Sequence, residues 1–199
     1  MPRPDGGIDT EGNRGGMMTF AVLSIGSNID CRESNIAAME RELGAILEGM
    51  KSSDLMETSP VDVDEPQPFY LNKIVAGRYV GNPYQLLDVC HAIELSLGRV
   101  REKPKSARTA DVDILIFGDM VINDGVVGHD GVLSGLVVPH PQILNRRFCL
   151  EGLMQIDPSI IIPGAAGATV GELYKNMGAD VAAQDVLYRL YEPCSTLVQ

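Results

Sequence analysis

Residues 99–118, RVREKPKSARTADVDILIFG, join a basic loop to a hydrophobic segment that carries two acidic side chains. The β-branched and aromatic residues that follow Asp111 favour a β-strand. Side chains two positions apart on a strand share a face, so Asp111 and Asp113 are expected side by side, roughly 6 to 7 Å apart. Two carboxylates on the core side of a buried strand are costly unless a cation compensates them. Mg²⁺ is the natural candidate because it binds carboxylate, water and phosphate oxygens; the alternative is a solvated edge strand with alternating polar positions.

The loop before this strand has a charge opposite to that of the whole chain. Five basic residues and one acidic residue between positions 99 and 108 give a local net charge of +4, whereas the chain carries −11. A local reversal of sign of this kind attracts an anionic substrate. The alternative interpretation is a solvated charged loop without a ligand.

The composition indicates one soluble globular domain. The chain has 199 residues, of which 45% are hydrophobic and 22% charged, and these are ordinary values for a soluble protein. The net negative charge argues against binding to a nucleic-acid backbone. No apolar run is long enough to span a membrane and no signal peptide is visible, so we expect a cytoplasmic protein. The four cysteines have no zinc-site spacing, and Cys90 and Cys149 are expected to be buried free thiols.

Three segments follow from composition: a disordered leader over residues 1–16, one domain over 17–178, and an extension of unknown role over 179–199. Hydrophobic periodicity predicts the following elements in the first part of the domain: a central strand over 19–26, a helix with apolar residues from 36 to 47, a strand over 51–57, a loop over 58–68, a strand over 70–80, and a helix from Asn82 to Gly98. With the strand after Asp111, the order is βαββαβ. This order predicts an α+β fold with a ferredoxin-like split βαβ core, an antiparallel-containing sheet with helices packed on it.

The second part of the domain has weaker signals. They predict a short strand over 120–122, an exposed glycine-rich loop over 123–135, an extended piece over 136–141, a helix over 145–156, and a strand over 186–191. Thr169 and Glu172 have the spacing of a capping box, which predicts the start of a last short helix.

Several common phosphate-handling motifs are absent from the sequence. There is no GxxxxGK followed by Ser or Thr, no GxGxxG, and no kinase catalytic loop. Any phosphoryl chemistry must therefore depend on side-chain cations and a metal ion.

Seven short motifs in order give the chain a family resemblance. They are GSN (26–28), ETSP (57–60), QPFYLN (67–72), IELSLGRVR (93–101), RTADVDILIFG (108–118), VPHP (138–141) and NRRF (145–148). From about residue 19 to residue 174 the chain resembles the 6-hydroxymethyl-7,8-dihydropterin pyrophosphokinases of folate biosynthesis. The resemblance implies an ATP-dependent enzyme that transfers pyrophosphate from ATP to the hydroxymethyl group of the dihydropterin and releases AMP.

The resemblance also implies roles for individual residues. It implies that Arg99, Arg108, Asp111 and Asp113 are catalytic and that the two aspartates hold two Mg²⁺ ions. Residues implied to bind ATP are His91, Glu94, Arg101, His140 and Arg146. Residues implied to bind the pterin are Ser59, Pro60, Tyr70, Asn72 and Phe148. On general grounds His91 and Glu94 could instead be solvated helix-face residues, and Phe148 could be a core residue.

Further expectations concern partners and activity. The implied partners are the small molecules ATP and dihydropterin, without nucleic acid or membrane, and the protein is expected to be a monomer or a weak homo-oligomer. The loop over residues 104–107 departs from the family pattern, because its basic residue is displaced and its frequent tryptophan is absent. The alternative function is therefore a degenerate, non-catalytic module that binds pterin or nucleotide and has a regulatory role. A third alternative is a ferredoxin-like interaction domain without a ligand.

Overall fold

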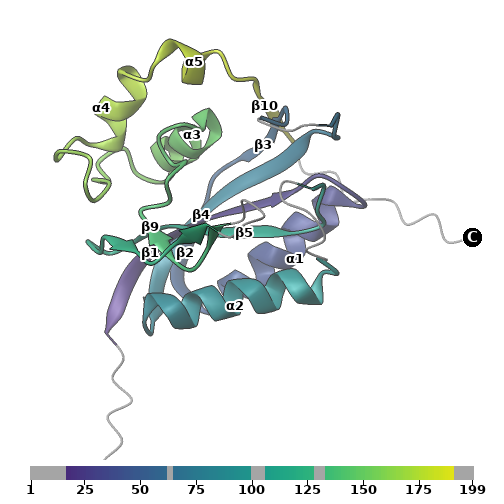
Figure 1. The fold of residues 1–199 in the computed structure, drawn as a ribbon, viewed down its shortest axis with the longest axis horizontal. Helices are drawn as coiled ribbons and strands as arrows, with labels where there is room; N and C mark the ends of the chain where they lie inside the picture. Colours follow the sequence, from purple (N-terminus) through teal and green to yellow (C-terminus); the bar gives the residue numbers. More distant parts are fainter. Residues whose placement is uncertain (1–16, 62–64, 100–105, 128–132, 191–199) are drawn as a thin grey trace, which may run out of the picture.

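The structure is a computed structural model that describes residues 17–61, 65–99, 106–127 and 133–190. The predicted leader lies outside these residues. A six-stranded sheet forms the centre of the molecule, with the strand order β10, β3, β4, β1, β5 and with β2 also paired to β4 (Figure 1). Every pairing in it is antiparallel. The strands are β1 (Met18–Ser27), β2 (Leu47–Ser52), β3 (Leu55–Thr58), β4 (Tyr70–Val80), β5 (Asp111–Phe117) and β10 (Val186–Arg189).

Helices cover both faces of the sheet. The helices α1 (Arg32–Gly44) and α2 (Pro83–Ser96) lie on one face, and α3 (Arg147–Ile156) lies on the other (Figure 1). The side chains of β1 alternate between the two faces, as a strand requires: Leu23 packs in the core under α1 and α2, whereas Val22 packs in the core under α3. The predictions of a central first strand and of an α+β sheet-and-helix fold are confirmed.

Two predicted elements have the predicted bounds because their local signals are strong. The third predicted strand is β4, and its residues Asn72, Ile74 and Ala76 are buried on one face. The helix α2 begins after Asn82, whose side chain accepts hydrogen bonds from the backbone N–H groups of the first turn. Gly98, just after the end of this helix, has a φ of 77°, which glycine adopts without strain.

The region between α1 and β4 corrects two predictions. The helix ends at Gly44, so Leu47, predicted as its last apolar residue, instead begins β2. The predicted strand over 51–57 is two strands, β2 and β3, which pair with different parts of β4. The interruption lies at Ser53, whose hydroxyl accepts a hydrogen bond from the N–H of Ile74 at 2.9 Å and so takes the place of a backbone group.

Two small ladders follow β5. The strand β6 (Ile122–Asn123) pairs with β9 (Val137–Val138), and β7 (Val126–Val127) pairs with β8 (Leu133–Ser134). The short strand predicted over 120–122 therefore begins later, and the predicted glycine-rich loop contains two strands. Residues 128–132 of that loop lie outside the described residues.

The last part of the chain returns to the central sheet. The helix α3 begins at Arg147, later than the predicted residue 145, and α4 (Val170–Lys175) has the predicted capping box at Thr169. After α5 (Ala179–Ala182), the strand β10 pairs with β3. The domain boundary at residue 178 stays a prediction, and the strand β10 of the predicted extension lies in the same sheet as the strands of the domain. None of the helices in the described ranges is sufficiently long and apolar to span a membrane.

Candidate active site

A cavity of about 520 Å³ opens at one end of the sheet, between β3, β4 and β5 and the start of α3. All five predicted pterin residues line it, together with three of the predicted catalytic and ATP-binding residues. The lining residues are Thr58, Ser59, Pro60, Val61, Tyr70, Asn72, Arg108, Asp111, Gln142, Asn145, Arg146, Phe148, Gln184, Asp185 and Val186. Segments far apart in the sequence therefore meet at this cavity.

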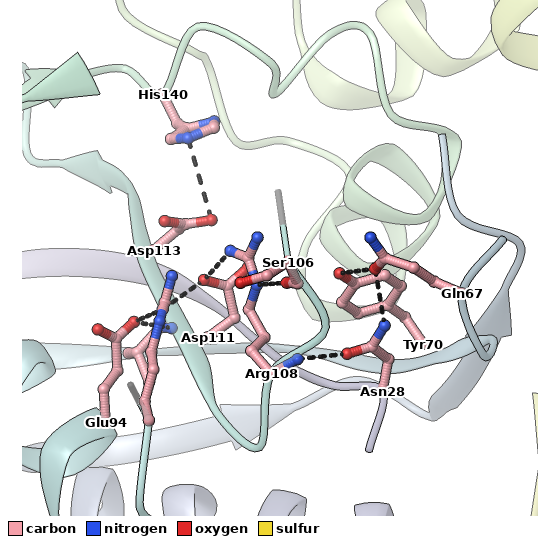
Figure 2. Close-up of polar contacts among 11 residues, drawn as sticks. Asn28, Gln67, Tyr70, Glu94, Ser106, Arg108, Asp111, Asp113 and His140 are labelled. Carbon is pink, nitrogen blue, oxygen red and sulfur yellow. Dashed lines mark hydrogen bonds and ion pairs between the residues drawn. The ribbon is translucent and has the colours of Figure 1, made fainter. Parts of the chain in front are cut away.

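Asp111, at the start of β5, is the centre of a charged cluster (Figure 2). Its Oδ1 lies 2.6 Å from Nη1 of Arg99 and 3.0 Å from Nη1 of Arg108. Burial alone would raise the pKa of Asp111, but the positive charges and hydrogen bonds of Arg108 and Arg99 lower it below its usual value. Asp111 is therefore ionised at neutral pH and holds both guanidinium groups in fixed positions.

Asp113 lies two residues further along β5 and has a different environment. Burial and the negative charge of Asp111 raise its pKa to about 7. Nε2 of His140 lies 4.0 Å from Oδ2 of Asp113 (Figure 2). Burial and the charge of Arg146 lower the pKa of His140 to about 4, so its imidazole is neutral at pH 7. The neutral imidazole of His140 therefore does not offset the negative charge of Asp113.

This pair of carboxylates has the chemistry of a divalent-cation site. The raised pKa of Asp113 means that its ionised form is disfavoured beside Asp111, and a bound cation would reverse this. In the part of the chain that the structure describes, no group of three or more His, Cys, Asp or Glu side chains could hold a metal ion. A cation at Asp111 and Asp113 would thus take its other ligands from water and substrate oxygens, which is the usual arrangement for Mg²⁺.

Glu94, on α2, is buried and bonds to groups that belong to the charged cluster. It forms an ion pair with Arg99, and its Oε1 accepts a hydrogen bond from the N–H of Val112 at 2.9 Å. The alternative prediction, that Glu94 is a solvated residue on the surface of its helix, is therefore wrong. His91, one turn earlier, is exposed and is absent from the cavity lining. Arg101 lies outside the described residues, so its predicted contact with ATP stays a prediction.

Asn28 joins the loops that border the cavity. Its side chain donates to Oε1 of Gln67 at 3.2 Å and accepts from the N–H of Arg108 at 2.7 Å. The hydroxyl of Tyr70 donates to the same Gln67 oxygen at 3.4 Å (Figure 2). The sequence marks Asn28 as a turn residue, but its role in positioning Arg108 depends on contacts across 80 residues and was not predicted.

The neutral side of the cavity contains an amide and two aromatic rings. Asn72 is buried, and its Nδ2 donates to Oγ1 of Thr58 at 2.8 Å. Gly26 faces it across the strands, and a Cβ there would lie only 2.9 Å from Oδ1 of Asn72. Phe148 lines the cavity and also packs in the core under α3. It is therefore a core residue that is also placed to contact a ligand.

Seven lining residues have no counterpart among the predicted site residues: Thr58, Val61, Gln142, Asn145, Gln184, Asp185 and Val186. Thr58 and Asn145 belong to the ETSP and NRRF motifs, so proximity to predicted residues could have indicated them. The last three belong to the C-terminal segment, whose sequence has no motif that points to a site.

Comparison with known proteins identifies the family of this chain. The family model of 7,8-dihydro-6-hydroxymethylpterin-pyrophosphokinase matches residues 22–158, a span that contains the charged cluster and most of the cavity lining. The chain belongs to this family. The family resemblance predicted from the seven motifs is confirmed.

Individual relatives support the membership. A 2-amino-4-hydroxy-6-hydroxymethyldihydropteridine pyrophosphokinase of Methylorubrum extorquens is 34% identical over 150 residues, which are 74% of this chain and 88% of the relative. The protein of the same name from Bacillus subtilis is 35% identical over 142 residues, which are 70% of this chain and 79% of that one.

A solved structure of Plasmodium falciparum HPPK-DHPS, the wild type with SDX-DHP, has a similar fold. It superposes with a TM-score of 0.60 at 16% sequence identity and covers 79% of this chain. The match spans only 44% of that longer chain. At this identity the likeness concerns the fold alone.

Proposed function

We propose that this member of the pyrophosphokinase family transfers pyrophosphate from ATP to 6-hydroxymethyl-7,8-dihydropterin and gives AMP and the pterin pyrophosphate in folate biosynthesis. The observation that carries the proposal is the arrangement of the cavity. Asp111 and Arg108 line the same cavity as Asn72, Tyr70 and Phe148. A polyphosphate and a flat heterocycle can therefore meet in it.

Arg99 and Arg108 are suited to the phosphates of ATP. Their guanidinium groups are planar and offer several N–H donors, so each can bind two phosphate oxygens at once. Both arginines are largely buried, with side chains 13% and 19% exposed, and charge–charge interactions are stronger away from water. They would stabilise the charge that develops on the transferred group during the reaction.

His140 and Arg146 would also contact the nucleotide. Nδ1 of His140 accepts a hydrogen bond from the N–H of Gln142 at 3.2 Å, so in the neutral ring the proton is on Nε2. His140 can thus donate one hydrogen bond without adding a positive charge. Arg146 lines the cavity directly and would supply the charge.

Asp111 and Asp113 would hold Mg²⁺, and the family resemblance implies two ions. When bound, Mg²⁺ neutralises polyphosphate charge and orients the phosphates for attack. Asp111 also holds Arg99 and Arg108 in place, so their guanidinium groups would lie beside any ion that the two aspartates hold. Positioning and electrostatic stabilisation would supply most of the rate enhancement, without a covalent intermediate.

Asn72 and the two rings would bind the dihydropterin. A carboxamide carries a donor and an acceptor and so matches the amide edge of a pterin. The Nδ2 of Asn72 already donates to Thr58, which fixes the orientation of the amide. Tyr70 and Phe148 would contact the faces of the heterocycle. We further infer a cytoplasmic protein that uses small-molecule substrates without nucleic acid, as a monomer or weak homo-oligomer.

The test is direct. Purified protein is mixed with Mg-ATP and the hydroxymethyl dihydropterin, and AMP and pterin pyrophosphate are followed by chromatography. We expect both products in equal amounts. Release of ADP in place of AMP would contradict the proposal. Saturable binding of a non-hydrolysable ATP analogue without AMP formation would instead favour the non-catalytic binding module.

A further inference from the structure

The side chain of Gln184 makes an unusual pair of contacts at the start of α3. Its Nε2 donates to the carbonyl oxygen of Asn145 at 2.8 Å, and its Oε1 accepts from the N–H of Arg147 at 3.0 Å. The two bonds bracket the backbone of Arg146, which precedes the helix. One carboxamide therefore fixes the peptide groups on both sides of a residue that lines the cavity.

The helix α3 needs such a contact because it has no cap of its own. Arg146 occupies the N-cap position and makes no capping hydrogen bond with its side chain. The first N–H groups of a helix have no partner within the helix and require one from elsewhere. Gln184 supplies that partner from 37 positions later in the chain.

The segment that carries Gln184 is itself anchored on both walls of the cavity. On one wall, Nη1 of Arg147 donates to the carbonyl oxygens of Ala182 and Gln184 at 3.0 and 3.1 Å. On the other wall, β10 pairs with β3 so that Val186 lies opposite Thr58. Gln184 therefore has little freedom to leave its place.

The position of Gln184 connects it to both predicted substrate subsites. The turn that it fixes carries Arg146, predicted to bind ATP, and leads to Phe148, predicted to bind the pterin. On the opposite wall, Thr58 accepts the hydrogen bond that orients Asn72. Gln184 lies outside residues 22–158, the part of the chain that the family model matches. The contact therefore involves a residue that this match does not include.

We propose that Gln184 is a positioning residue for the active site and that it holds Arg146 and Phe148 in the orientation in which they contact substrate. The inference rests on the proposed function for the identity of the ligands. The contact itself can be tested without them.

The first experiment measures amide hydrogen exchange in the ligand-free full-length protein. In Gln184→Ala the N–H of Arg147 loses its acceptor, so we expect exchange at Arg147 to be about tenfold faster. The matched control is Asn176→Ala, which removes an amide that donates to the carbonyl of Glu172 at 2.9 Å, outside the cavity. It should leave exchange at the start of α3 unchanged. Equal exchange in Gln184→Ala and the wild type would overturn the proposal.

The second experiment measures the dissociation constants of the dihydropterin and of a non-hydrolysable ATP analogue below the unfolding temperature of each variant. We expect Gln184→Ala to weaken dihydropterin binding about tenfold and Asn176→Ala to leave it unchanged. A general loss of stability would affect the unfolding temperature but not binding by the folded fraction. Unchanged binding of both ligands in folded Gln184→Ala would overturn the proposal.

Gln184→Glu separates the two hydrogen bonds and serves if the alanine variant does not fold. Glutamate keeps the acceptor for Arg147 and loses the donor to Asn145, so exchange at Arg147 should stay near the wild-type rate while dihydropterin affinity falls about threefold. Exchange as fast as that expected for Gln184→Ala would count against the proposal. If wild-type protein makes no AMP but Gln184→Ala accelerates exchange, the proposed function fails and the positioning role stands.

Discussion

The two ends of the cavity hold their side chains in place by different means. The phosphate end is defined as Arg99, Arg108, Asp111, Asp113 and His140. Its centre, Asp111, is held by the opposite charges of Arg99 and Arg108, both within about 3 Å. The pterin end, defined as Thr58, Tyr70, Asn72 and Phe148, is held by neutral hydrogen bonds and packing. Removal of a charge leaves its buried partner unpaired, whereas removal of a neutral group leaves a weaker defect. Substitutions should therefore have graded effects, with the largest at the phosphate end.

The largest effect should follow from replacement of both aspartates. In Asp111→Ala with Asp113→Ala we expect the rate of AMP formation to fall about 10³-fold, because the proposed metal ligands and the partner of both arginines are lost together. The control is Asp119→Ala, an exposed aspartate just beyond the end of β5. Initial rates at saturating Mg-ATP check this prediction. Comparable rates in the double variant and the wild type would refute the assignment of the phosphate end.

A smaller loss should follow from Arg108→Lys. Lysine keeps the positive charge but cannot reproduce the planar donors that contact Asp111 and would bind the phosphates, so we expect a fall in kcat of about 10²-fold. Arg41→Lys, at an exposed ion pair on α1, is the matched control. Steady-state kinetics measure both variants. A lysine variant that matches the wild type would mean that charge alone is sufficient at this position.

A substitution at the pterin end should weaken substrate binding rather than slow the chemical step. In Asn72→Ala we expect the KM for dihydropterin to rise about tenfold, because the amide edge of the ligand loses a donor and an acceptor. The KM for ATP should change little, since Asn72 contacts Thr58 and not the charged cluster. Asn123→Ala, at an exposed residue of β6, is the control. Parallel increases in both KM values would show that the two ends are not separate.

The smallest effect concerns stability and its dependence on pH. Burial would raise the pKa of Glu57, but hydrogen bonds and charge from Arg189 and Arg32 lower it overall. A lowered folded-state pKa contributes stability above the unfolded pKa, and this contribution is lost as the pH falls through the folded value. We expect Glu57→Gln to reduce the free energy of unfolding by about 1 kcal/mol at pH 7. The difference from wild type should shrink as the pH falls below the ordinary pKa of a glutamate and disappear once the pH is below the lowered pKa of Glu57.

Urea unfolding of Glu57→Gln at several pH values measures this effect. Glu42→Gln, whose side chain is exposed on α1, should change the free energy of unfolding by less than about 0.5 kcal/mol at any pH. A Glu57 difference that is constant with pH would show that the carboxylate charge does not stabilise the attachment of β10.

Local signals in the sequence predicted most of the core. The apolar pattern of β1, the cap at Asn82 and the two acids of β5 can each be recognised from residues that are neighbours in the sequence. Long-range pairing explains the errors. Ser53 interrupts a strand because its hydroxyl bonds to Ile74 of another strand, and no window around residue 53 contains that partner.

The candidate site divides in the same way. Arg99 to Asp113 lie close in sequence, so their spacing already suggested a phosphate and metal site. Asn28, Asn72 and Gln184 come from distant parts of the sequence, and only the fold brings them to the site. Motifs indicated Asn72 through the family resemblance. No sequence signal indicated Gln184, because its partners are backbone groups, which any sequence provides.

The pairing of β10 with β3 also affects when the site can form during synthesis. Arg189 contacts Glu57 across 132 positions of the chain, so that contact cannot form until residue 189 has left the ribosome. A nascent chain that has emerged only as far as β5 can form the pairs of β1 with β4 and β5 but lacks one wall of its cavity. Completion of the binding cavity therefore has to wait for the synthesis of β10, whereas the central strand pairs do not.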